Sequence, residues 1–149
     1  MIVRRMEPGD AGAAAELEAE LFALPWSEQG FLDALDRPDT LYLAAIQEEK
    51  LAGYCGMWCV LDEAEITNVA VRPSFRRRGI GREMLTELIR RGRKRQISTF
   101  FLEVRESNEA AIRLYESLGF AVNGLRKNFY DRPRENAVLM ILKADGQPN

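Results

Sequence analysis

Hydrophobic residues along this chain of 149 residues alternate with polar ones in some stretches and recur at helical spacing in others. Alternating runs bounded by Gly, Pro, Asp and Glu are typical of strands joined by turns. Runs with apolar residues three and four positions apart are typical of helices with one buried face. The predicted strands are 2–6, 41–47, 51–60, 65–71, 99–104, 120–130 and 137–143, and the predicted helices are 10–24, a short one after Ser27, one after the segment RRRGIG, and 108–118.

Local signals mark the ends of the predicted helices. Asp10 is placed to cap the first helix, on which Leu17, Leu21 and Leu24 share one face, and Pro25 is expected to end it. Ser27 is placed to cap the short second helix, and Gly119 lies where a glycine commonly ends a helix, after 108–118.

The order of elements is β-α-α-β-β-β-α-β-α-β-β. Hairpin turns between 41–47, 51–60 and 65–71 predict antiparallel neighbours. The crossover helix between 65–71 and 99–104 predicts that these two strands are parallel. The expected fold is therefore a mixed α/β (α+β) fold in a single domain, residues 1–149, with a mostly antiparallel sheet, one central parallel strand pair and helices on both faces.

The composition restricts the chemistry. The chain has no histidine, which excludes nucleophiles activated by histidine and any histidine base. Cys55 and Cys59 are the only cysteines, and their spacing is not that of a zinc site, so no metal is expected. Proton transfer must use Asp, Glu, Tyr, Lys or Cys.

No apolar run is long enough to cross a bilayer, and the N-terminal residues lack the apolar core of a signal peptide. We therefore expect a cytoplasmic protein that does not bind membranes.

Basic residues are concentrated in the middle of a chain whose net charge is −2. Three interpretations are open: a solvated helix face, a site for a phosphate-bearing ligand, or an RNA-binding surface. The acidic pI of about 5.4 and the lack of aromatic residues within the run oppose direct binding of nucleic acid. The run comprises Arg76, Arg77, Arg78, Arg82, Arg90, Arg91, Arg93, Lys94 and Arg95.

The segment RRRGIGRE follows a predicted strand and opens a predicted helix. Glycines allow a tight turn and a close approach of a ligand to the backbone, and the first amides of a helix favour an anion. The segment is neither a Walker A loop nor a dinucleotide-binding fingerprint. By itself it is equally consistent with an ordinary helix start.

Glu103 stands in an apolar strand, in the sequence FFLEVRESN. Burying a carboxylate without a partner is costly, so this position calls for an explanation. Glu103 is either a functional base or a structural residue paired with an arginine such as Arg105. Tyr115 has a similar ambiguity, because it shares a helical stripe with Ala111 and Leu118 and so fits core packing as well as a site.

Taken together, these motifs resemble the GNAT superfamily of N-acetyltransferases over essentially the whole chain. Its Q/R-x-x-G-x-G/A loop corresponds to Arg76–Gly81 here. The preceding strand corresponds to Ile66–Val71, and the late helix motif to Asn108–Phe120.

The resemblance implies acetyl-CoA as co-substrate. Main-chain groups of one strand would bind the pantetheine arm, amides of the glycine turn would bind the pyrophosphate, and one asparagine would contact the reacting end. These residues are Val69, Ala70 and Val71, then Arg77, Arg78, Gly79, Ile80, Gly81 and Arg82, and finally Asn108.

Within the superfamily, the chain resembles the bacterial enzymes that acetylate the N-terminal alanine of a small-subunit ribosomal protein. The residues that carry this are LPWS (24–27), DEAEI (62–66), LEVR (102–105) and NFY (128–130), where the group commonly has NYY. This resemblance implies Glu103 as general base, Tyr115 as general acid and a protein N-terminus as substrate. Acetylation of another amine, such as lysine, a polyamine or a small metabolite, remains open.

Overall fold

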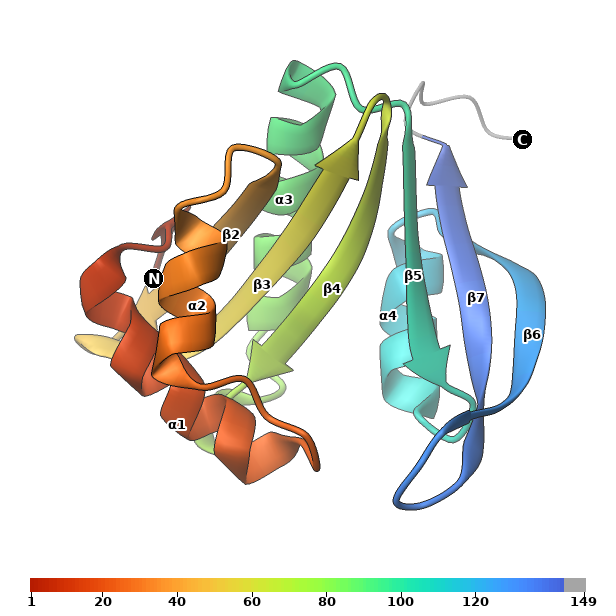
Figure 1. The fold of residues 1–149 in the computed structure, drawn as a ribbon, viewed down its shortest axis with the longest axis horizontal. Helices are drawn as coiled ribbons and strands as arrows, with labels where there is room; N and C mark the ends of the chain where they lie inside the picture. Colours follow the sequence, from red (N-terminus) through yellow and green to blue (C-terminus); the bar gives the residue numbers. More distant parts are fainter. Residues whose placement is uncertain (144–149) are drawn as a thin grey trace.

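In the computed structural model, which describes residues 1–143, seven strands form one sheet in the order β1-β2-β3-β4-β5-β7-β6 (Figure 1). The strands are β1 (Ile2–Arg5), β2 (Thr40–Gln47), β3 (Lys50–Val60), β4 (Glu63–Val71), β5 (Thr99–Arg105), β6 (Ala121–Tyr130) and β7 (Glu135–Lys143). The helices are α1 (Ala11–Leu21), α2 (Glu28–Leu35), α3 (Ile80–Lys94) and α4 (Glu109–Ser117), with short 3-10 turns at Pro8–Asp10 and Pro73–Phe75.

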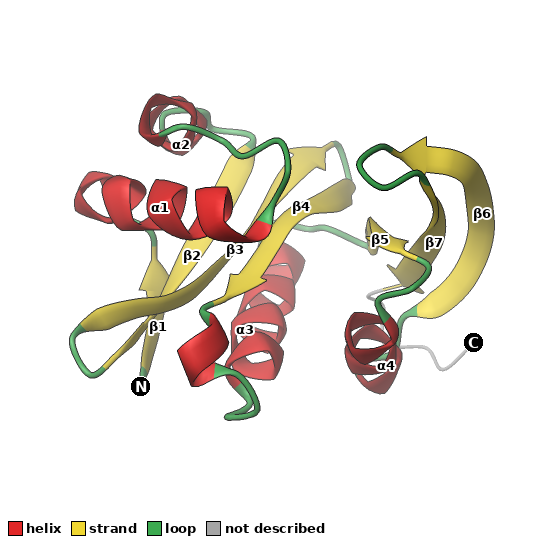
Figure 2. Cartoon of the chain, turned by 90° about the horizontal axis from the view of Figure 1, so that it is seen from below, coloured by secondary structure: helices red, strands yellow, loops and turns green. Residues whose placement is uncertain are grey.

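The predicted order of elements and the fold class are confirmed. β4 and β5 are parallel, and the other neighbours in the sheet are antiparallel. Figure 2 shows α1 and α2 on one face of the sheet and α3 and α4 on the other. All predicted strand ends are correct to within two residues.

Asp10 occupies the N-cap position of α1 as expected, but its side chain accepts no hydrogen bond from the helix. It adopts a helical conformation within the preceding 3-10 turn, so its carboxylate faces back along the chain. There it accepts the backbone N–H of Glu7 at 2.8 Å and pairs with Arg4 at 2.7 Å. The same residue type therefore anchors the turn before the helix instead of the helix itself.

The C-terminal end of α1 was also predicted wrongly. The helix stops at Leu21, and Phe22 is already extended, with φ −124° and ψ 145°. Leu24 is 77% exposed and does not belong to the buried face. Pro25 therefore lies in a loop that has already left the helix, and this loop (22–26) becomes part of the site described below.

Other predicted helix ends are confirmed. The backbone N–H of Gly30 donates to Ser27 Oγ at 3.1 Å and caps α2. The N–H of Ala111 donates to Asn108 Oδ1 at 3.2 Å and caps α4. Gly119 follows α4 with φ +103°, a conformation that glycine adopts without a steric penalty.

Two hydrophobic cores lie on opposite faces of the sheet. One packs α3 and α4 against the sheet and includes Met84, Leu85 and Leu88, all fully buried. The other packs α1 and α2 on the opposite face and includes Leu17 and Phe31, also fully buried. Because each such side chain contributes about 1.5–3 kcal/mol on burial, both faces hold the sheet firmly in place.

The sheet opens between β4 and β5. Their pairing is confined to three residue pairs at the start of both strands, ending at Glu65 and Phe101. Beyond this point β4 has a bulge, because Gly56 and Met57 of β3 pair with Asn68 and Ile66 and leave Thr67 unmatched. A bulge bends its strand, and Figure 1 shows β4 and β5 diverging from their common start.

Candidate active site

A cleft of about 1060 Å³ lies where β4 and β5 have separated. Its walls come from β4, the N-terminus of α3, β5, α4, the loop after α1, and the end of β6. It therefore joins segments from both halves of the chain. Of the residues expected to form a site, the cleft is lined by Val69, Val71, Arg77, Gly79, Ile80, Gly81, Arg82, Glu103, Asn108 and Tyr115.

The glycine turn forms the mouth of this cleft. Gly79 precedes α3 with φ +77°, and an added Cβ there would meet no atom within 4 Å. Arg77 also has positive φ, at +65°. The first bond of the helix joins the N–H of Glu83 to the oxygen of Gly79. The amides of the first turn before Glu83 are therefore free of helical partners and suit an anion.

Basic side chains reinforce this mouth, although not all of the predicted ones do. Arg76, Arg77 and Arg82 line the cleft. Arg82 also donates to the hydroxyl of Ser117 on α4, which ties the two cleft helices together. The geometry fits a ligand with a pyrophosphate group, because unpaired amides and cationic side chains meet at one place.

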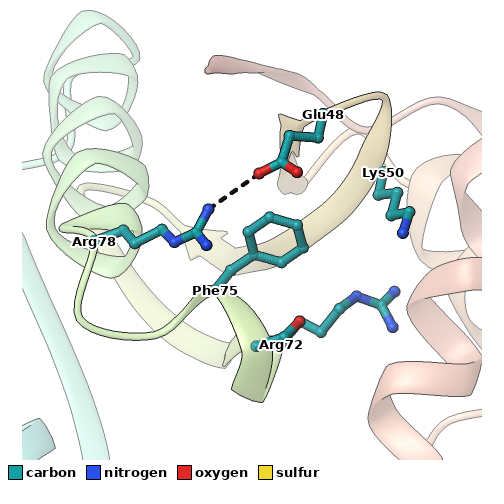
Figure 3. Close-up of a pocket in the computed structure, with 6 residues that line it drawn as sticks. Glu48, Lys50, Arg72, Phe75 and Arg78 are labelled. Carbon is teal, nitrogen blue, oxygen red and sulfur yellow. Dashed lines mark hydrogen bonds and ion pairs between the residues drawn. The ribbon is translucent and has the colours of Figure 1, made fainter.

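Arg78 is an exception, because its side chain points away from the cleft. Figure 3 shows it reaching toward Glu48, whose Oε2 lies 3.1 Å from its Nη1. Its guanidinium also lies over the ring of Phe75, 4.9 Å from the centroid. Together with Lys50 and Arg72 these residues line a separate pocket of about 420 Å³.

The rest of the basic run is dispersed. Arg90 and Arg91 both pair with Glu87 of the same helix, at 2.6 Å. Arg95 donates to the main-chain oxygen of Thr40 at 3.3 Å. The run therefore serves several local purposes and does not form one continuous basic face.

The edge of β4 provides the floor of the cleft. After Glu65 the strand has no partner on the β5 side within residues 1–143, so main-chain groups on that edge face the cleft. Val69 and Val71 line it. Ala70 does not, because its side chain is buried among the residues of the α1–α2 core on the opposite face. Any contact of Ala70 with a ligand would thus involve its main chain alone.

Tyr115 of α4 lines the cleft, and so does Asn108, the N-cap residue of the same helix. It is 7% exposed, and its ring meets that of Phe120 at 5.8 Å, so it is both a core residue and a cleft residue. Burial raises the pKa of Tyr115 above its usual value, and the nearby Cys55 thiol adds to the effect. Tyr115 therefore keeps its proton and is suited to donating a hydrogen bond.

Glu103 lies on β5 at the point where the strands part. Its side chain is 15% exposed, and its Oε2 lies 3.0 Å from Nε of Arg126 on β6. The expected arginine, Arg105, instead pairs with Glu135 at 3.2 Å. Glu103 therefore has an arginine partner, but this partner is Arg126 and not the expected Arg105.

The contact between Glu103 and Arg126 has an unusual geometry. The two charges are within ion-pair distance, yet Oε2 is buried and accepts no well-directed hydrogen bond from residues 1–143. Both observations hold together if the guanidinium neutralises the carboxylate without aiming an N–H at it. Oε2 is therefore neutralised by charge without being hydrogen-bonded, while the Glu103 side chain, 15% exposed, lines the cleft.

The opposite wall of the cleft comes from the loop after α1. Trp26 is 36% exposed, packs against Phe31 and Tyr42 at 5.2 and 5.9 Å, and lines the cleft. Its backbone N–H donates to Glu18 Oε2 at 3.2 Å. Glu18 is 3% exposed and accepts a second hydrogen bond from the hydroxyl of Tyr54. A buried carboxylate therefore fixes this loop to the sheet.

The end of β6 and the loop that follows it also line the cleft. Phe129 and Tyr130 are the last residues of β6, with ring centroids 5.1 Å apart, and Asp131 begins the loop. Arg105 holds the loop by donating to the main-chain oxygens of Asp131 and Pro133 at 3.2 and 3.0 Å, and its guanidinium lies over the Tyr130 ring at 4.4 Å.

Sequence reasoning missed the roles of Glu18, Arg105 and Arg126. A glutamate on the buried side of α1, next to Leu17, was the available signal for Glu18. Nothing in the sequence marked Arg126 as the partner of Glu103. It lies 23 residues later, in a strand whose polar and apolar residues do not alternate regularly. Asp62 and Glu63 lie at the closed start of β4 and outside the cleft lining, so they do not contribute to the site.

The acetyltransferase (GNAT) family model matches residues 12–120, which include the bulged strand, the glycine turn and the late helix. The chain belongs to the acetyltransferase (GNAT) family. This membership gives the combination of an anion-binding turn and a split sheet a common explanation.

Similar proteins agree with this assignment. The chain is 41% identical over 143 residues to the [ribosomal protein bS18]-alanine N-acetyltransferase of Escherichia coli K12, covering 94% of this chain and 95% of that protein. A crystal structure of the E. coli ribosomal-protein-S18-alanine N-acetyltransferase superposes with a TM-score of 0.88 at 40% identity, covering 96% and 93% of the two chains. The NAA60 protein of Arabidopsis thaliana, solved with acetyl-CoA, shares the GNAT fold with a TM-score of 0.88 at 19% identity, covering 97% and 99%.

Two further findings concern the GNAT domain as described. None of its helices within residues 1–143 is long and apolar enough to span a membrane. Cys55 and Cys59 are free and lie in β3, and burial raises the pKa of both thiols, so neither is an activated nucleophile.

Proposed function

We propose that this acetyltransferase moves the acetyl group of acetyl-CoA to the N-terminal α-amine of a protein. The substrate class follows from relatives about 40% identical over nearly the whole chain, which are ribosomal protein bS18-alanine N-acetyltransferases. The expected cytoplasmic location remains a prediction.

The observation that carries the chemistry is the position of Glu103. Its side chain lines the cleft together with the glycine turn and the loop after α1, and its Oε2 accepts no well-directed hydrogen bond from residues 1–143. An amine must be neutral to attack a carbonyl, so a carboxylate that accepts its proton is the required device.

The residues of the chain divide the remaining work. The main-chain edge of Val69 and Val71 and the free amides from Ile80 to Arg82 would hold acetyl-CoA, which supplies the activated acetyl group. Tyr115 would donate a hydrogen bond to the departing thiolate. Its raised pKa makes complete proton transfer to a thiolate unfavourable, so stabilisation by hydrogen bond is its main contribution.

The amine class fits a single carboxylate base. An N-terminal α-amine has a pKa near ~8, whereas a lysine side chain has one near ~10.4 and is almost fully charged at pH 7. A single base in a cleft closed by aromatic residues such as Trp26 and Phe129 suits the former better. Binding both substrates together also removes the need for an acyl-enzyme.

A peptide panel tests the proposal. Peptides beginning with the alanine end of bS18, the same peptides with a blocked α-amine and one internal lysine, and a polyamine are incubated with acetyl-CoA and analysed by mass spectrometry. We expect acetylation of the free N-terminus only. Modification of the lysine or the polyamine without any N-terminal product would refute it.

The base assignment has its own test. Glu103→Gln should lower kcat by about 10²–10⁴-fold, the range of a lost general base, while acetyl-CoA affinity by calorimetry stays within about twofold. Glu116→Gln, an exposed residue next to Tyr115, is the matched control and should behave as wild type. A large loss of acetyl-CoA affinity in Glu103→Gln would instead mean that Glu103 is structural.

A further inference from the structure

Two carboxylates and one guanidinium gather where β4 and β5 part, and of the three only Glu103 lines the cleft. Glu65 is the last β4 residue paired with β5, opposite Phe101, and Glu103 lies two residues after Phe101. Because strand side chains alternate, Glu65 and Glu103 project from the same face of neighbouring strands. Arg126 reaches this face from β6 and lies 3.0 Å from Glu103.

The electrostatics of Glu65 agree with this grouping. Burial raises the pKa of Glu65, the charge of Glu103 raises it further, and the charge of Arg126 opposes the rise. The charges of Glu103 and Arg126 therefore both act on the Glu65 carboxylate. With two carboxylates and one arginine, the cluster carries a net charge of −1 when both acids are ionised.

Arg126 is the member that can move. Its side chain is 61% exposed, whereas that of Glu103 is 15% exposed. Its contact with Glu103 lacks a well-directed hydrogen bond, and its guanidinium lies 5.4 Å from the ring centroid of Phe129. A long side chain held by charge and one aromatic ring exchanges partners readily.

The pairing seen here presents a difficulty for catalysis. A cation next to a carboxylate favours its ionised form and makes it a poorer proton acceptor. Once Glu103 takes a proton, the guanidinium would also be left without a counter-charge unless a second acid is within reach. Glu65 projects from the same face of the neighbouring strand, diagonally across from Glu103, and can supply that charge.

We propose that Arg126 is shared between Glu103 and Glu65, and that Glu65 is a positioning residue which draws the guanidinium away as Glu103 accepts the substrate's proton. This inference rests on the proposed role of Glu103 as base. It adds Arg126 and Glu65 as tuning groups for this reaction.

The transfer is balanced. The amine nitrogen forms a bond to the acetyl carbon, the carbon–sulfur bond breaks, and the sulfur leaves as a thiolate next to Tyr115. One proton of the amine goes to a Glu103 carboxylate oxygen. Arg126 then pairs with ionised Glu65, and it returns to Glu103 when the proton passes to water.

Other titratable and charged groups near Glu103 cannot replace Glu65 as the second partner of Arg126. Tyr130 of β6 faces it, and burial together with the Glu103 charge raises the pKa of this tyrosine, so it stays neutral. Arg105 on the same strand is held by Glu135 of β7. Glu18, across the cleft, is bound by Tyr54 and by the backbone of the loop after α1.

The test is a carboxyl ¹³C NMR titration of Glu103 in the full chain, in wild type, Glu65→Gln, Arg126→Gln and the double variant. Arg126→Gln should raise the titration midpoint by about one pH unit, since it removes an adjacent cation. Glu65→Gln should lower the midpoint, because Arg126 then has no alternative partner. When Arg126 is already replaced by Gln, Glu65→Gln should change the Glu103 titration midpoint by at most half as much as it does in the wild-type background.

Glu63→Gln is the matched control, since Glu63 lies on the same strand face at the closed end and is exposed. Equal Glu65→Gln shifts with and without Arg126 would overturn the proposal, because the two acids would then act independently. No shift in either background would overturn it as well. Circular dichroism and acetyl-CoA affinity check that every variant is folded.

Activity separates this inference from the proposed function. The acidic limb of the pH dependence of kcat/KM should move in parallel with the NMR midpoints. If Glu103→Gln retains wild-type turnover, Glu103 is not the base. The NMR titrations then still show whether Arg126 couples Glu103 to Glu65. If the coupling is absent while Glu103→Gln is inactive, only the shared arginine is refuted.

Discussion

Replacing Glu18 by alanine should loosen the wall of the cleft formed by the loop after α1. This carboxylate is 3% exposed and holds two groups, the hydroxyl of Tyr54 and the backbone N–H of Trp26. The substitution removes both acceptors at once. Its effect should therefore appear in stability and in peptide binding together.

The magnitude follows from what each donor loses. Tyr54 is fully buried, so its hydroxyl is left without a partner, which costs about 1–3 kcal/mol. The side chain also leaves a small void, worth about 0.8 kcal/mol for each buried methylene lost. The N–H of Trp26 borders the cleft and can bind water, so its loss adds little. We expect about 3 kcal/mol less free energy of unfolding.

Urea unfolding followed by far-ultraviolet circular dichroism measures this change, and steady-state kinetics with a bS18-type peptide measures the functional part. The KM for peptide should rise about tenfold, while the KM for acetyl-CoA changes little, because the glycine turn is on the other side of the cleft. Glu16→Ala, an exposed position on the same helix, is the control and should shift stability by less than about 0.5 kcal/mol.

Two results would refute this reasoning. A loss of stability below about 1 kcal/mol would mean that the buried hydrogen bonds contribute little net free energy. An unchanged peptide KM despite a clear loss of stability would mean that the loop does not contact the substrate. Tyr54→Phe removes the same hydrogen bond from the other side, and a double-mutant cycle with Glu18→Ala isolates its coupling energy.

Three further outcomes are expected. Tyr115→Phe should slow turnover while acetyl-CoA affinity and the melting temperature stay close to wild type, and a wild-type rate would contradict its role. Gly56→Ala should destabilise the protein by about 1–3 kcal/mol in thermal unfolding, because the new Cβ would lie 2.1 Å from the Tyr42 ring and displace it from the β4 bulge. Hydrogen bonds from Arg90 and Arg91 lower the pKa of Glu87 to about 2. The ionised carboxylate therefore stabilises the folded state at neutral pH, and this stabilisation is lost as the pH falls from about 4.5 through 2. Glu87→Gln should then cost less than about 1 kcal/mol at pH 7, with the difference from wild type vanishing near pH 2, because such exposed pairs are screened.

Much of the fold could be read from the sequence because it depends on local patterns. The spacing of Met84, Leu85 and Leu88 predicted α3, and the crossover after it predicted the parallel pair. Ser27 and Gly119 predicted helix ends through hydrogen bonds and dihedral angles that involve only nearby residues. The glycine turn was recognisable for the same reason.

Other features were decided by contacts between distant segments. Asp10 had the right residue type for a cap, yet Arg4 and the backbone of Glu7 compete for its carboxylate. Arg78 belonged to the right motif, yet Glu48 and Phe75 turn its side chain out of the cleft. A short motif specifies a backbone conformation, whereas the direction of a long side chain depends on which partners the fold brings within reach.

The sequence by itself determined which elements form, the order in which they pair, and the presence of an apolar strand with a carboxylate in it. Only the tertiary structure decided that Arg126 neutralises that carboxylate, that Glu18 ties down the loop after α1, and that the bulge at Thr67 separates β4 from β5. The physical reason is range. Backbone propensity acts over a few residues, while charge pairing and burial are set by neighbours that only the folded sheet brings together.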